Sequence, residues 1–210
     1  MPPTWTRADF AEKFDVSRET IQRLDEFELL LRKWNPAINL VARSTLDDIW
    51  RRHIADSAQI WQYAQPGFDH WVDFGTGGGF PGLVVAILAA EHHPHGRVTM
   101  VESDQRKATF LRIVAAQLKL SANIFTERAE ELQPQSADIV SARAVAPLKL
   151  LLKYAHRHLK PSGRALFMKG KSFRSEVAEA LESWAFQSDE YTSTTDGSAV
   201  VLSLGDIRRV

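Results

Sequence analysis

The first 69 residues carry the apolar spacing of amphipathic helices. One stripe recurs at three- and four-residue intervals and comprises Ile21, Leu24, Phe27, Leu31 and Trp34. Ser17 stands where it can cap this helix, and Thr6 with Asp9 forms a capping-box pattern ahead of an earlier, shorter helix. We expect the long helix to end at Asn35-Pro36, because the residue before a proline is disfavoured in the helical region.

A third helix is predicted between this proline and residue 65. Thr45 and Asp48 have the spacing of a second capping box. The apolar positions that follow are Leu46, Ile49, Trp50, Ile60 and Trp61, which extend the helix to about Ala64. Gln65-Pro66-Gly67 then predicts a turn.

After residue 70 short apolar runs alternate with helical patterns. The expected strands are Trp71–Phe74, Val98–Glu102, Asn123–Thr126, Asp138–Ser141 and Arg164–Met168. The expected helices between and after them are Leu83–Ala90, Lys107–Leu118, Leu148–His158 and Ser175–Trp184. Strict alternation of this kind predicts an α/β fold with a doubly wound, mostly parallel sheet.

Residues 187–210 add one antiparallel strand to this sheet. Gln187–Thr192 and Ala199–Leu204 flank Thr195-Asp196-Gly197, which is typical of a hairpin turn. The sequence therefore predicts a helical N-terminal region over residues 1–69 and an α/β domain over residues 70–210.

The segment Asp73 to Gly82 (DFGTGGGFPG) is the strongest motif, and it lies between a predicted strand and a predicted helix. Gly77, Gly79 and Gly82 satisfy the G-x-G-x-x-G pattern of dinucleotide-binding loops. Asp73 with Gly75, Gly77 and Gly79 also fits the acidic residue plus G-x-G-x-G arrangement that binds S-adenosylmethionine. A carboxylate beside the loop would repel a pyrophosphate, so Asp73 favours the ligand without phosphate.

Glu102 comes at the end of the next predicted strand. A carboxylate at that place can accept hydrogen bonds from ribose hydroxyls with either ligand. A glycine-rich turn without any ligand is the remaining alternative. It is disfavoured because ordering several glycines costs conformational entropy and adds no side-chain packing.

Composition excludes several kinds of chemistry. The chain is 44% hydrophobic and 25% charged, as in ordinary globular proteins, and contains no cysteine. Disulfides, thiolate metal sites and cysteine nucleophiles are therefore excluded. The longest apolar run, Leu83–Ala90, is too short to span a membrane, and Met1-Pro2-Pro3-Thr4-Trp5 lacks the pattern of a secretory signal. We expect a cytoplasmic protein that does not enter a membrane.

Charge is balanced overall but unevenly distributed. There are 26 Lys and Arg residues against 26 Asp and Glu, yet residues 139–175 contain no acidic residue. The basic residues in this stretch that we expect to bind RNA are Lys149, Lys153, Arg157, Lys169 and Lys171. The first three recur on one helix face, and a merely solvated face is the alternative.

Further candidates lie in the third helix. Arg51 and Arg52 can reach RNA, and His53 is a further predicted RNA contact. His53 and Asp56 fall on the apolar stripe, so the alternative is a hydrogen-bonded pair that ties the N-terminal region to the core. His92-His93-Pro94-His95 lacks acidic partners, and we expect it to be surface and not a metal site.

Several segments together carry a resemblance to a known family. DFGTGGGFPG, VESDQRKATFLR, ERAEE and SARA, with NPAINLVA and WRRHIADS upstream, resemble the bacterial small-subunit rRNA guanine-N7 methyltransferases, the glucose-inhibited division protein B family. The resemblance covers about residues 29–171. It implies the class I (Rossmann-like) methyltransferase fold and S-adenosylmethionine as cofactor. It also implies cofactor contacts at Gly75, Phe80, Ala129, Glu130 and Arg143, and small-subunit rRNA or a ribosomal particle as partner.

The residues constrain which methylation is possible. Methylation at pyrimidine C5 needs a cysteine, and adenine N6 chemistry usually follows an N/D-P-P-F/Y motif where this chain has Ser141-Ala142-Arg143-Ala144. Guanine N7 has an in-plane lone pair and needs no deprotonation, so positioning can suffice. A small-molecule methyltransferase and an RNA-binding assembly module with a vestigial loop are the alternative functions. Arg143 could instead form a strand-end ion pair with Asp138 or Glu130. We expect the chain to act as a monomer.

Overall fold

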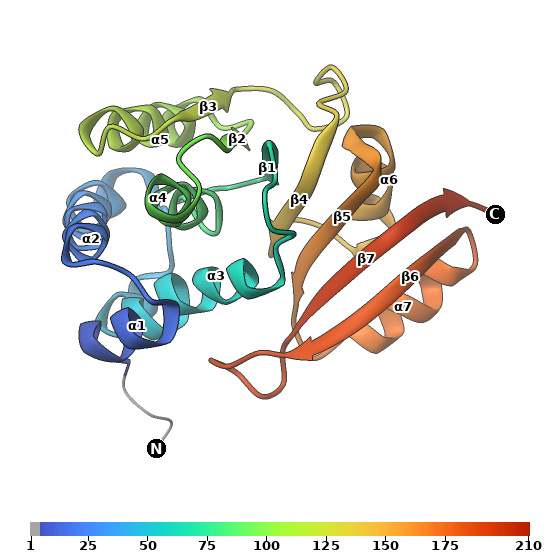
Figure 1. The fold of residues 1–210 in the computed structure, drawn as a ribbon, viewed down its shortest axis with the longest axis horizontal. Helices are drawn as coiled ribbons and strands as arrows, with labels where there is room; N and C mark the ends of the chain where they lie inside the picture. The colour runs from blue at the N-terminus through green and yellow to red at the C-terminus, as the bar shows by residue number, and fades with distance from the viewer. Residues whose placement is uncertain (1–4) are drawn as a thin grey trace.

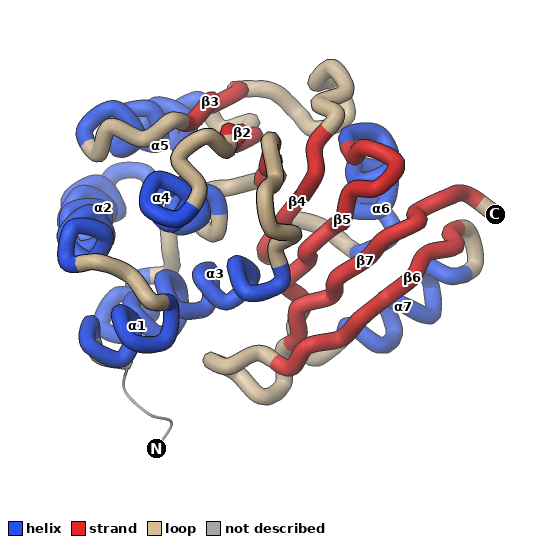
Figure 2. The backbone as a smooth tube through the Cα atoms, viewed as in Figure 1, coloured by secondary structure: helices blue, strands red, loops and turns tan. Residues whose placement is uncertain are grey.

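A seven-stranded sheet forms the centre of the molecule in the computed structural model, which describes residues 5–210 (Figures 1 and 2). The strands are β1 (His70–Phe74), β2 (Arg97–Val101), β3 (Ala122–Phe125), β4 (Ala137–Arg143), β5 (Leu159–Lys169), β6 (Trp184–Thr192) and β7 (Val200–Arg209). Their order across the sheet is β3-β2-β1-β4-β5-β7-β6. Residues 1–4, on which the expectation about a secretory signal chiefly rests, lie outside the described part of the chain.

The sheet confirms the predicted α/β class and its strand directions. β1 pairs in parallel with both β2 and β4, so the strand order reverses direction between β1 and β4. β7 is the antiparallel strand, and it inserts between β5 and β6. The carboxyl ends of β1, β2, β3 and β4 therefore lie on one edge of the sheet, where open α/β sheets bind their ligands.

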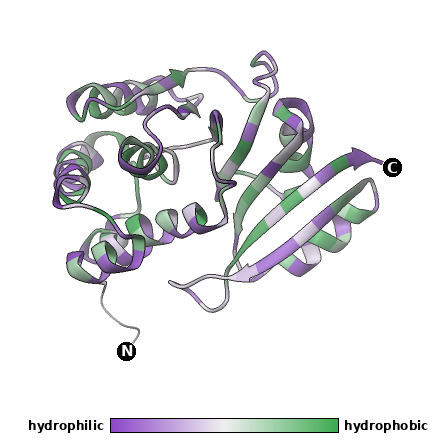
Figure 3. Cartoon of the chain, in the orientation of Figure 1, coloured by the Kyte–Doolittle hydropathy of each residue, from purple (hydrophilic) through white to green (hydrophobic). Residues whose placement is uncertain are grey.

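Helices cover both faces of the sheet because its central strands bury alternate side chains in different clusters. Trp71 of β1 packs with residues of helix α4 (Gly82–His92), whereas Val72 packs with residues of α6 (Leu148–His158). α5 (Gln105–Gln117) contributes to the cluster that also contains α4, and α7 (Phe173–Leu181) contributes to the cluster of α6. Figure 3 shows that α4 is hydrophobic along most of its length, as expected for a helix buried between a sheet and other helices.

The N-terminal helices α1 (Arg7–Phe14) and α2 (Arg18–Ile38) form a further layer over α4 and α5. Both predicted helix starts are confirmed. Thr6 and Asp9 make a reciprocal capping box, and the Ser17 side chain accepts a hydrogen bond from the main-chain N–H of Thr20. Buried Phe27 and Leu31 share one core with residues of α4 and α5, so the N-terminal region is packed as an integral layer.

The predicted end of α2 was wrong. The helix runs through Pro36 to Ile38 and ends at Asn39, whose φ is 50°. Two contacts stabilise the extra turn: the buried Asn35 side chain accepts a hydrogen bond from the main-chain N–H of Val41 at 2.9 Å, and the N–H of Asn39 donates to the carbonyl of Asn35. Tertiary contacts thus outweigh the local preference against helix before proline.

The third helix was also predicted too simply. The segment forms a 3₁₀ turn (Arg43–Asp48), a π-helical turn (Trp50–Ala55), a short α3 (Asp56–Ala58) and a second 3₁₀ turn (Gln59–Tyr63). The expected capping box is absent from it, because Thr45 donates to the carbonyl of Ala42 and Asp48 pairs with Arg51. π-helical turns often occur at functional sites, and this one carries residues of the pocket described below.

Within residues 5–210, no helix is both long enough and apolar enough to cross a membrane.

Candidate functional site

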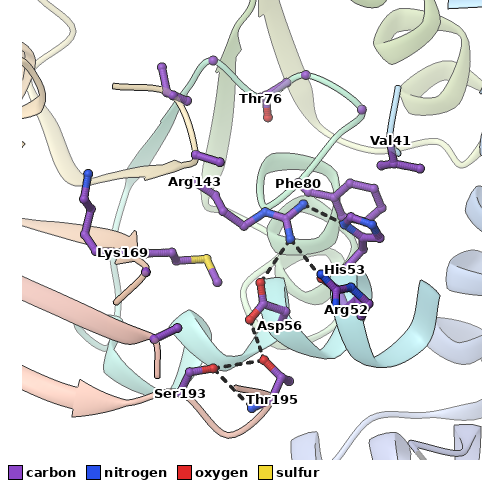
Figure 4. Close-up of a pocket in the computed structure, with 18 of the residues that line it drawn as sticks. Val41, Arg52, His53, Asp56, Thr76, Phe80, Arg143, Lys169, Ser193 and Thr195 are labelled. Atoms are coloured by element: carbon purple, nitrogen blue, oxygen red, sulfur yellow. Dashed lines mark hydrogen bonds and ion pairs between the residues drawn. The ribbon is translucent and has the colours of Figure 1, made fainter. Parts of the chain in front are cut away.

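A pocket of about 810 Å³ opens at the carboxyl edge of the sheet. Seven segments contribute to its lining. They are the residues after α2, the π-helical turn, the glycine loop after β1, the residues after β2, the end of β4, the end of β5 and the loop between β6 and β7 (Figure 4). Pockets of this size accommodate drug-sized ligands and cofactors.

The glycine loop, residues 75–82, takes a backbone conformation that side chains disfavour. Gly75 has a φ of +60°, and a Cβ built on it would lie 2.6 Å from a methyl group of Val145. Gly77 also has a positive φ, +55°, but nothing lies closer to its Cβ position than 3.8 Å. Gly75 is therefore required by both conformation and space, whereas Gly77 leaves open room at the pocket wall.

Asp73 lies beneath this loop and is fully buried. Its carboxylate accepts hydrogen bonds from the Ser141 hydroxyl at 2.6 Å, from the main-chain N–H of Gly82 at 3.0 Å and from the Thr76 hydroxyl. Burial raises the pKa of Asp73 to about 6, although these donors act in the opposite direction. The carboxylate therefore braces the loop against β4 and the start of α4, and it does not line the pocket.

Glu102 lines the pocket and faces the glycine loop. One carboxylate oxygen accepts a hydrogen bond from the main-chain N–H of Gly77 at 2.9 Å, and the other accepts one from the N–H of Asp104 at 2.8 Å. The carboxylate thus connects the ends of β1 and β2 at the place where the sequence predicted a ribose site.

Opposite the loop lies a cluster of side chains centred on Arg143, which we call the arginine cluster: Arg52, His53, Asp56, Arg143 and Thr195. The guanidinium of Arg143 donates to Asp56 at 3.1 Å, to Nδ1 of His53 at 3.1 Å and to the carbonyl of Arg52 at 3.2 Å. It also lies 5.1 Å from the ring centroid of Phe80, within cation–π range. The ion pair that Arg143 forms is therefore with Asp56, and neither of the partners weighed from sequence, Asp138 or Glu130, was right.

His53 is held as a neutral ring within this cluster. Since a guanidinium can only donate, Nδ1 of His53 accepts from Arg143, and Nε2 carries the hydrogen toward the Thr45 hydroxyl 2.7 Å away. Burial lowers the pKa of His53 to about 3, with further lowering from Arg143 and Arg52. His53 and Asp56 are thus joined through Arg143 and not as the direct pair weighed from the sequence.

The loop between β6 and β7 is attached to the same cluster. The Thr195 hydroxyl donates to Asp56 at 2.6 Å, and the carbonyl of Thr195 accepts from Arg51 at 3.1 Å. Gln59 adds bonds to the Ser193 hydroxyl and to the N–H of Thr194. Residues more than 130 positions apart in the sequence therefore form one wall of the pocket.

The structure brings together about half of the predicted site residues. Those that line the pocket are Gly75, Gly77, Phe80, Glu102 and Arg143 from the cofactor set, and Arg51, Arg52, His53 and Lys169 from the RNA set. Lys169 is ion-paired with Glu176 at 2.6 Å and also donates to the carbonyl of Ala146. The residues placed elsewhere are Asp73 below the loop, Ala129 and Glu130 after β3, Lys149, Lys153 and Arg157 on α6, and Lys171 in an exposed turn.

Sequence reasoning missed several pocket residues. Thr76, Lys107, Gln59 and Thr195 all line the pocket. Thr76 belongs to the glycine loop and could have been found from its place beside Asp73. Thr195 and Gln59 offered no local signal, because the contact that matters joins segments distant in sequence.

Comparison with solved structures defines the class of fold. The chain is similar to the mitomycin 7-O-methyltransferase MmcR, with a TM-score of 0.60 and 16% identity over 100% of this chain and 74% of that chain. It is also similar to a SAM-dependent methyltransferase from Aquifex aeolicus, with a TM-score of 0.59 and 13% identity over 77% of this chain and 95% of that chain. The fold is that of the class I methyltransferases.

The family follows from sequence comparison. Residues 20–202 match the family model described as rRNA small subunit methyltransferase G. The chain therefore belongs to this family, and the family membership inferred from the sequence motifs is confirmed. The protein named ribosomal RNA small subunit methyltransferase G in Cereibacter sphaeroides is 50% identical over 194 residues, covering 92% of this chain and 93% of the relative. The protein of the same name in Rhodospirillum centenum is 49% identical over 205 residues, covering 98% and 93%.

Proposed function

We propose that this chain transfers a methyl group from S-adenosylmethionine to N7 of a guanine in small-subunit ribosomal RNA. The observation that carries the proposal is that one pocket joins the glycine loop and Glu102 to a wall of arginines. Membership of the rRNA small subunit methyltransferase G family supports it.

The residues present fit S-adenosylmethionine. The space at the Gly77 Cβ position leaves the main chain open to a ligand, and Glu102 offers carboxylate oxygens at the end of β2. When bound, the cofactor supplies an electrophilic methyl group on a sulfonium. We assign its contacts to Gly75, Gly77, Phe80, Glu102, Ala129, Glu130 and Arg143, while Asp73 acts from below by fixing the loop.

Methyl transfer to guanine N7 requires the protein mainly to position the two reactants. Transfer to guanine N7 would need no proton to leave the base, because the N7 lone pair is free to accept the methyl group that the bound cofactor would supply. The obvious candidates for a general base are engaged: both ring nitrogens of His53 have partners, and both oxygens of Glu102 accept main-chain hydrogen bonds. Holding the reacting atoms in line is therefore the main catalytic device.

RNA is expected to approach over the arginine side of the pocket. Arg51, Arg52, His53 and Lys169 line the pocket, and Lys149, Lys153 and Lys171 provide further positive charge for phosphates. We infer that a monomeric chain in the cytoplasm acts on the RNA or on a ribosomal particle. Sedimentation of the protein at micromolar concentration tests the monomer.

Two other functions are distinguishable. A small-molecule methyltransferase would leave the arginine wall without a role, and an assembly module with a vestigial loop would not need the buried carboxylate below it. Titration calorimetry with S-adenosylhomocysteine separates the module from an enzyme, because a vestigial loop gives no heat.

The function is tested by transfer of a labelled methyl group. Small-subunit rRNA from cells that lack the protein is incubated with the chain and labelled S-adenosylmethionine, then digested to nucleosides. We expect label in N7-methylguanosine alone. Label in another nucleoside, or none in RNA under conditions where the cofactor binds, would contradict the proposal.

A further inference from the structure

Helix α6 holds the loop that follows β3, residues 126–136, through three side chains of one face. Tyr154, Arg157 and His158 are spaced three and four residues apart, so they project toward the same side of the helix. In Figure 1 this loop, drawn in yellow, passes close to one end of α6. The sequence pattern had instead placed Arg157 with Lys149 and Lys153 as a contact to RNA phosphate.

Arg157 and His158 bond to main-chain carbonyls of the loop. The Arg157 guanidinium donates through Nε and Nη2 to the carbonyl of Leu132, at 3.1 and 2.9 Å. Nε2 of His158 lies 2.8 Å from the carbonyl of Ala129 and must carry the hydrogen, since a carbonyl only accepts. His158 is fully buried, and burial lowers its pKa, so the ring stays neutral in this contact.

Tyr154 meets the same loop at Glu130. Burial, and after it the Glu130 carboxylate, raise the pKa of the Tyr154 hydroxyl to about 12. The hydroxyl therefore remains protonated and can donate to the carboxylate. Three successive contacts along one helix face thus fix Ala129, Glu130 and Leu132.

The loop lies beside the cofactor half of the pocket. The N–H of Glu102 donates to the carbonyl of Phe125, the last residue of β3, at 3.0 Å. Ala129 and Leu132 are buried in one cluster with Phe74 and Val101, which end β1 and β2. In the sheet, β3 is the neighbour of β2 on the side away from β1. A nucleoside whose ribose bonds to Glu102 at the end of β2 would therefore place its base near the loop that follows β3.

We propose that Arg157 and His158 are positioning residues that set the loop of Ala129 and Glu130 to receive the adenine base of the methyl donor. The inference rests on the proposed function, because it takes the ligand at Glu102 to be an adenine nucleoside. It separates Arg157 from Lys153, one turn earlier on α6. Both residues are exposed, but the Arg157 guanidinium is bonded to the Leu132 carbonyl, whereas the Lys153 ammonium is suited to phosphate.

The first test compares Arg157→Gln with Lys153→Gln, which removes the same charge from the same helix. The dissociation constant of S-adenosylhomocysteine is measured by calorimetry, and that of small-subunit rRNA at several salt concentrations. We expect Arg157→Gln to weaken S-adenosylhomocysteine about tenfold and to leave the salt slope of RNA binding unchanged. Lys153→Gln should leave cofactor affinity unchanged and lower the salt slope by about 0.7 to 0.9.

Two further measurements distinguish positioning from a general loss of structure. Arg157→Lys keeps one donor in place of the planar fork, and it should restore part of the affinity. The ratio of the dissociation constants of S-inosylhomocysteine and S-adenosylhomocysteine reports how well the adenine edge is read. We expect this ratio to be at least about three in the wild type and to fall toward one in Arg157→Gln.

The outcomes are separable. Three results for Arg157→Gln would overturn this inference but not the proposed function. The first is full affinity for S-adenosylhomocysteine, and the second is a salt slope of RNA binding that falls as in Lys153→Gln. The third is an unchanged ratio of the two dissociation constants, with both ligands equally weakened. A wild type that binds both ligands equally would also overturn it. A wild type that binds neither ligand would overturn the proposed function, and this inference with it.

Discussion

The two walls of the pocket are built in opposite ways. The glycine loop is one contiguous segment, held mainly by main-chain groups and by the buried carboxylate of Asp73. The arginine cluster joins side chains from the π-helical turn, the end of β4 and the β6–β7 loop. The first wall therefore depends on backbone conformation, and the second on hydrogen bonds between distant side chains.

This difference suggests separate tasks. A rigid main-chain wall suits a cofactor that is the same in every turnover, whereas a side-chain wall of arginines suits a charged RNA. Changes in the glycine loop should then affect cofactor affinity, and changes in the arginine cluster should affect transfer to RNA. Arg143 is the exception, because it is also a proposed cofactor contact.

The largest effect is expected for Arg143→Gln. The change removes a proposed cofactor contact together with the ion pair to Asp56 and the donor to His53, so the methyl group and the guanine are no longer held in line. Misplacement of this kind costs about a hundredfold in kcat. Single-turnover transfer to rRNA measures it, with Arg164→Gln, an ion-paired arginine that does not line the pocket, as control. Equal loss in both variants would refute a specific role for Arg143.

Gly75→Ala should chiefly weaken cofactor binding. A side chain at φ +60° costs about 1–2 kcal/mol, and the new Cβ would also press on Val145. We expect roughly thirtyfold weaker S-adenosylhomocysteine binding. Gly67→Ala is the matched control, since Gly67 has a φ of +75° with nothing within 4 Å; it should lose stability but no cofactor affinity. Equal affinity in the two variants would contradict the separation of tasks.

Thr195→Val tests the connection between the β6–β7 loop and Arg143. The change leaves Asp56 without one of its donors, so the ion pair with Arg143 is less well held. Loss of a hydrogen bond to a charged group, about 1.5 kcal/mol, predicts about a tenfold fall in kcat with unchanged cofactor affinity. Thr194→Val, whose side chain is exposed, should behave as wild type, and Thr195→Ser should restore activity. A Thr195→Ser variant as slow as Thr195→Val would point to packing instead.

The smallest effect concerns pH. The pKa of His53 is lowered to about 3 in the folded chain, so between pH 6.5 and 3 the unfolded chain binds the extra proton and stability falls on acidification. From pH 7.5 to 5.0 the full linkage amounts to about 2 kcal/mol, and solvent screening of the partly exposed ring reduces it to about 1 kcal/mol. Urea unfolding at both pH values should show a smaller fall for His53→Gln than for wild type or for the exposed control His95→Gln. An identical fall in all three would exclude a neutral His53 as the cause.

The sequence predicted the sheet well because its signals are local. Alternating apolar runs located the seven strands, and the glycine spacing located the loop after β1. The ends of helices were less predictable: Pro36 lies inside α2 because the side chain of Asn35 finds a partner in Val41.

Side-chain roles were predictable only where the partner is near in sequence. Asp73 was recognised as part of the motif, but one of the donors to its buried carboxylate, Ser141 of β4, is distant in sequence. Arg157 looks like Lys149 and Lys153 in a helical pattern, and only the fold reveals the Leu132 carbonyl beside it. The bonds of Arg143 to Asp56 and of Asp56 to Thr195 join three segments that no spacing rule connects.

The central claim is that the cofactor wall and the arginine wall act together on one guanine of small-subunit rRNA. Nucleoside analysis of that RNA, from cells that lack the gene and from cells complemented with wild type or Arg143→Gln, tests it most directly. We predict that N7-methylguanosine falls by one residue per RNA without the gene, returns with the wild type, and stays low with Arg143→Gln. Unchanged N7-methylguanosine in the cells that lack the gene would contradict the account.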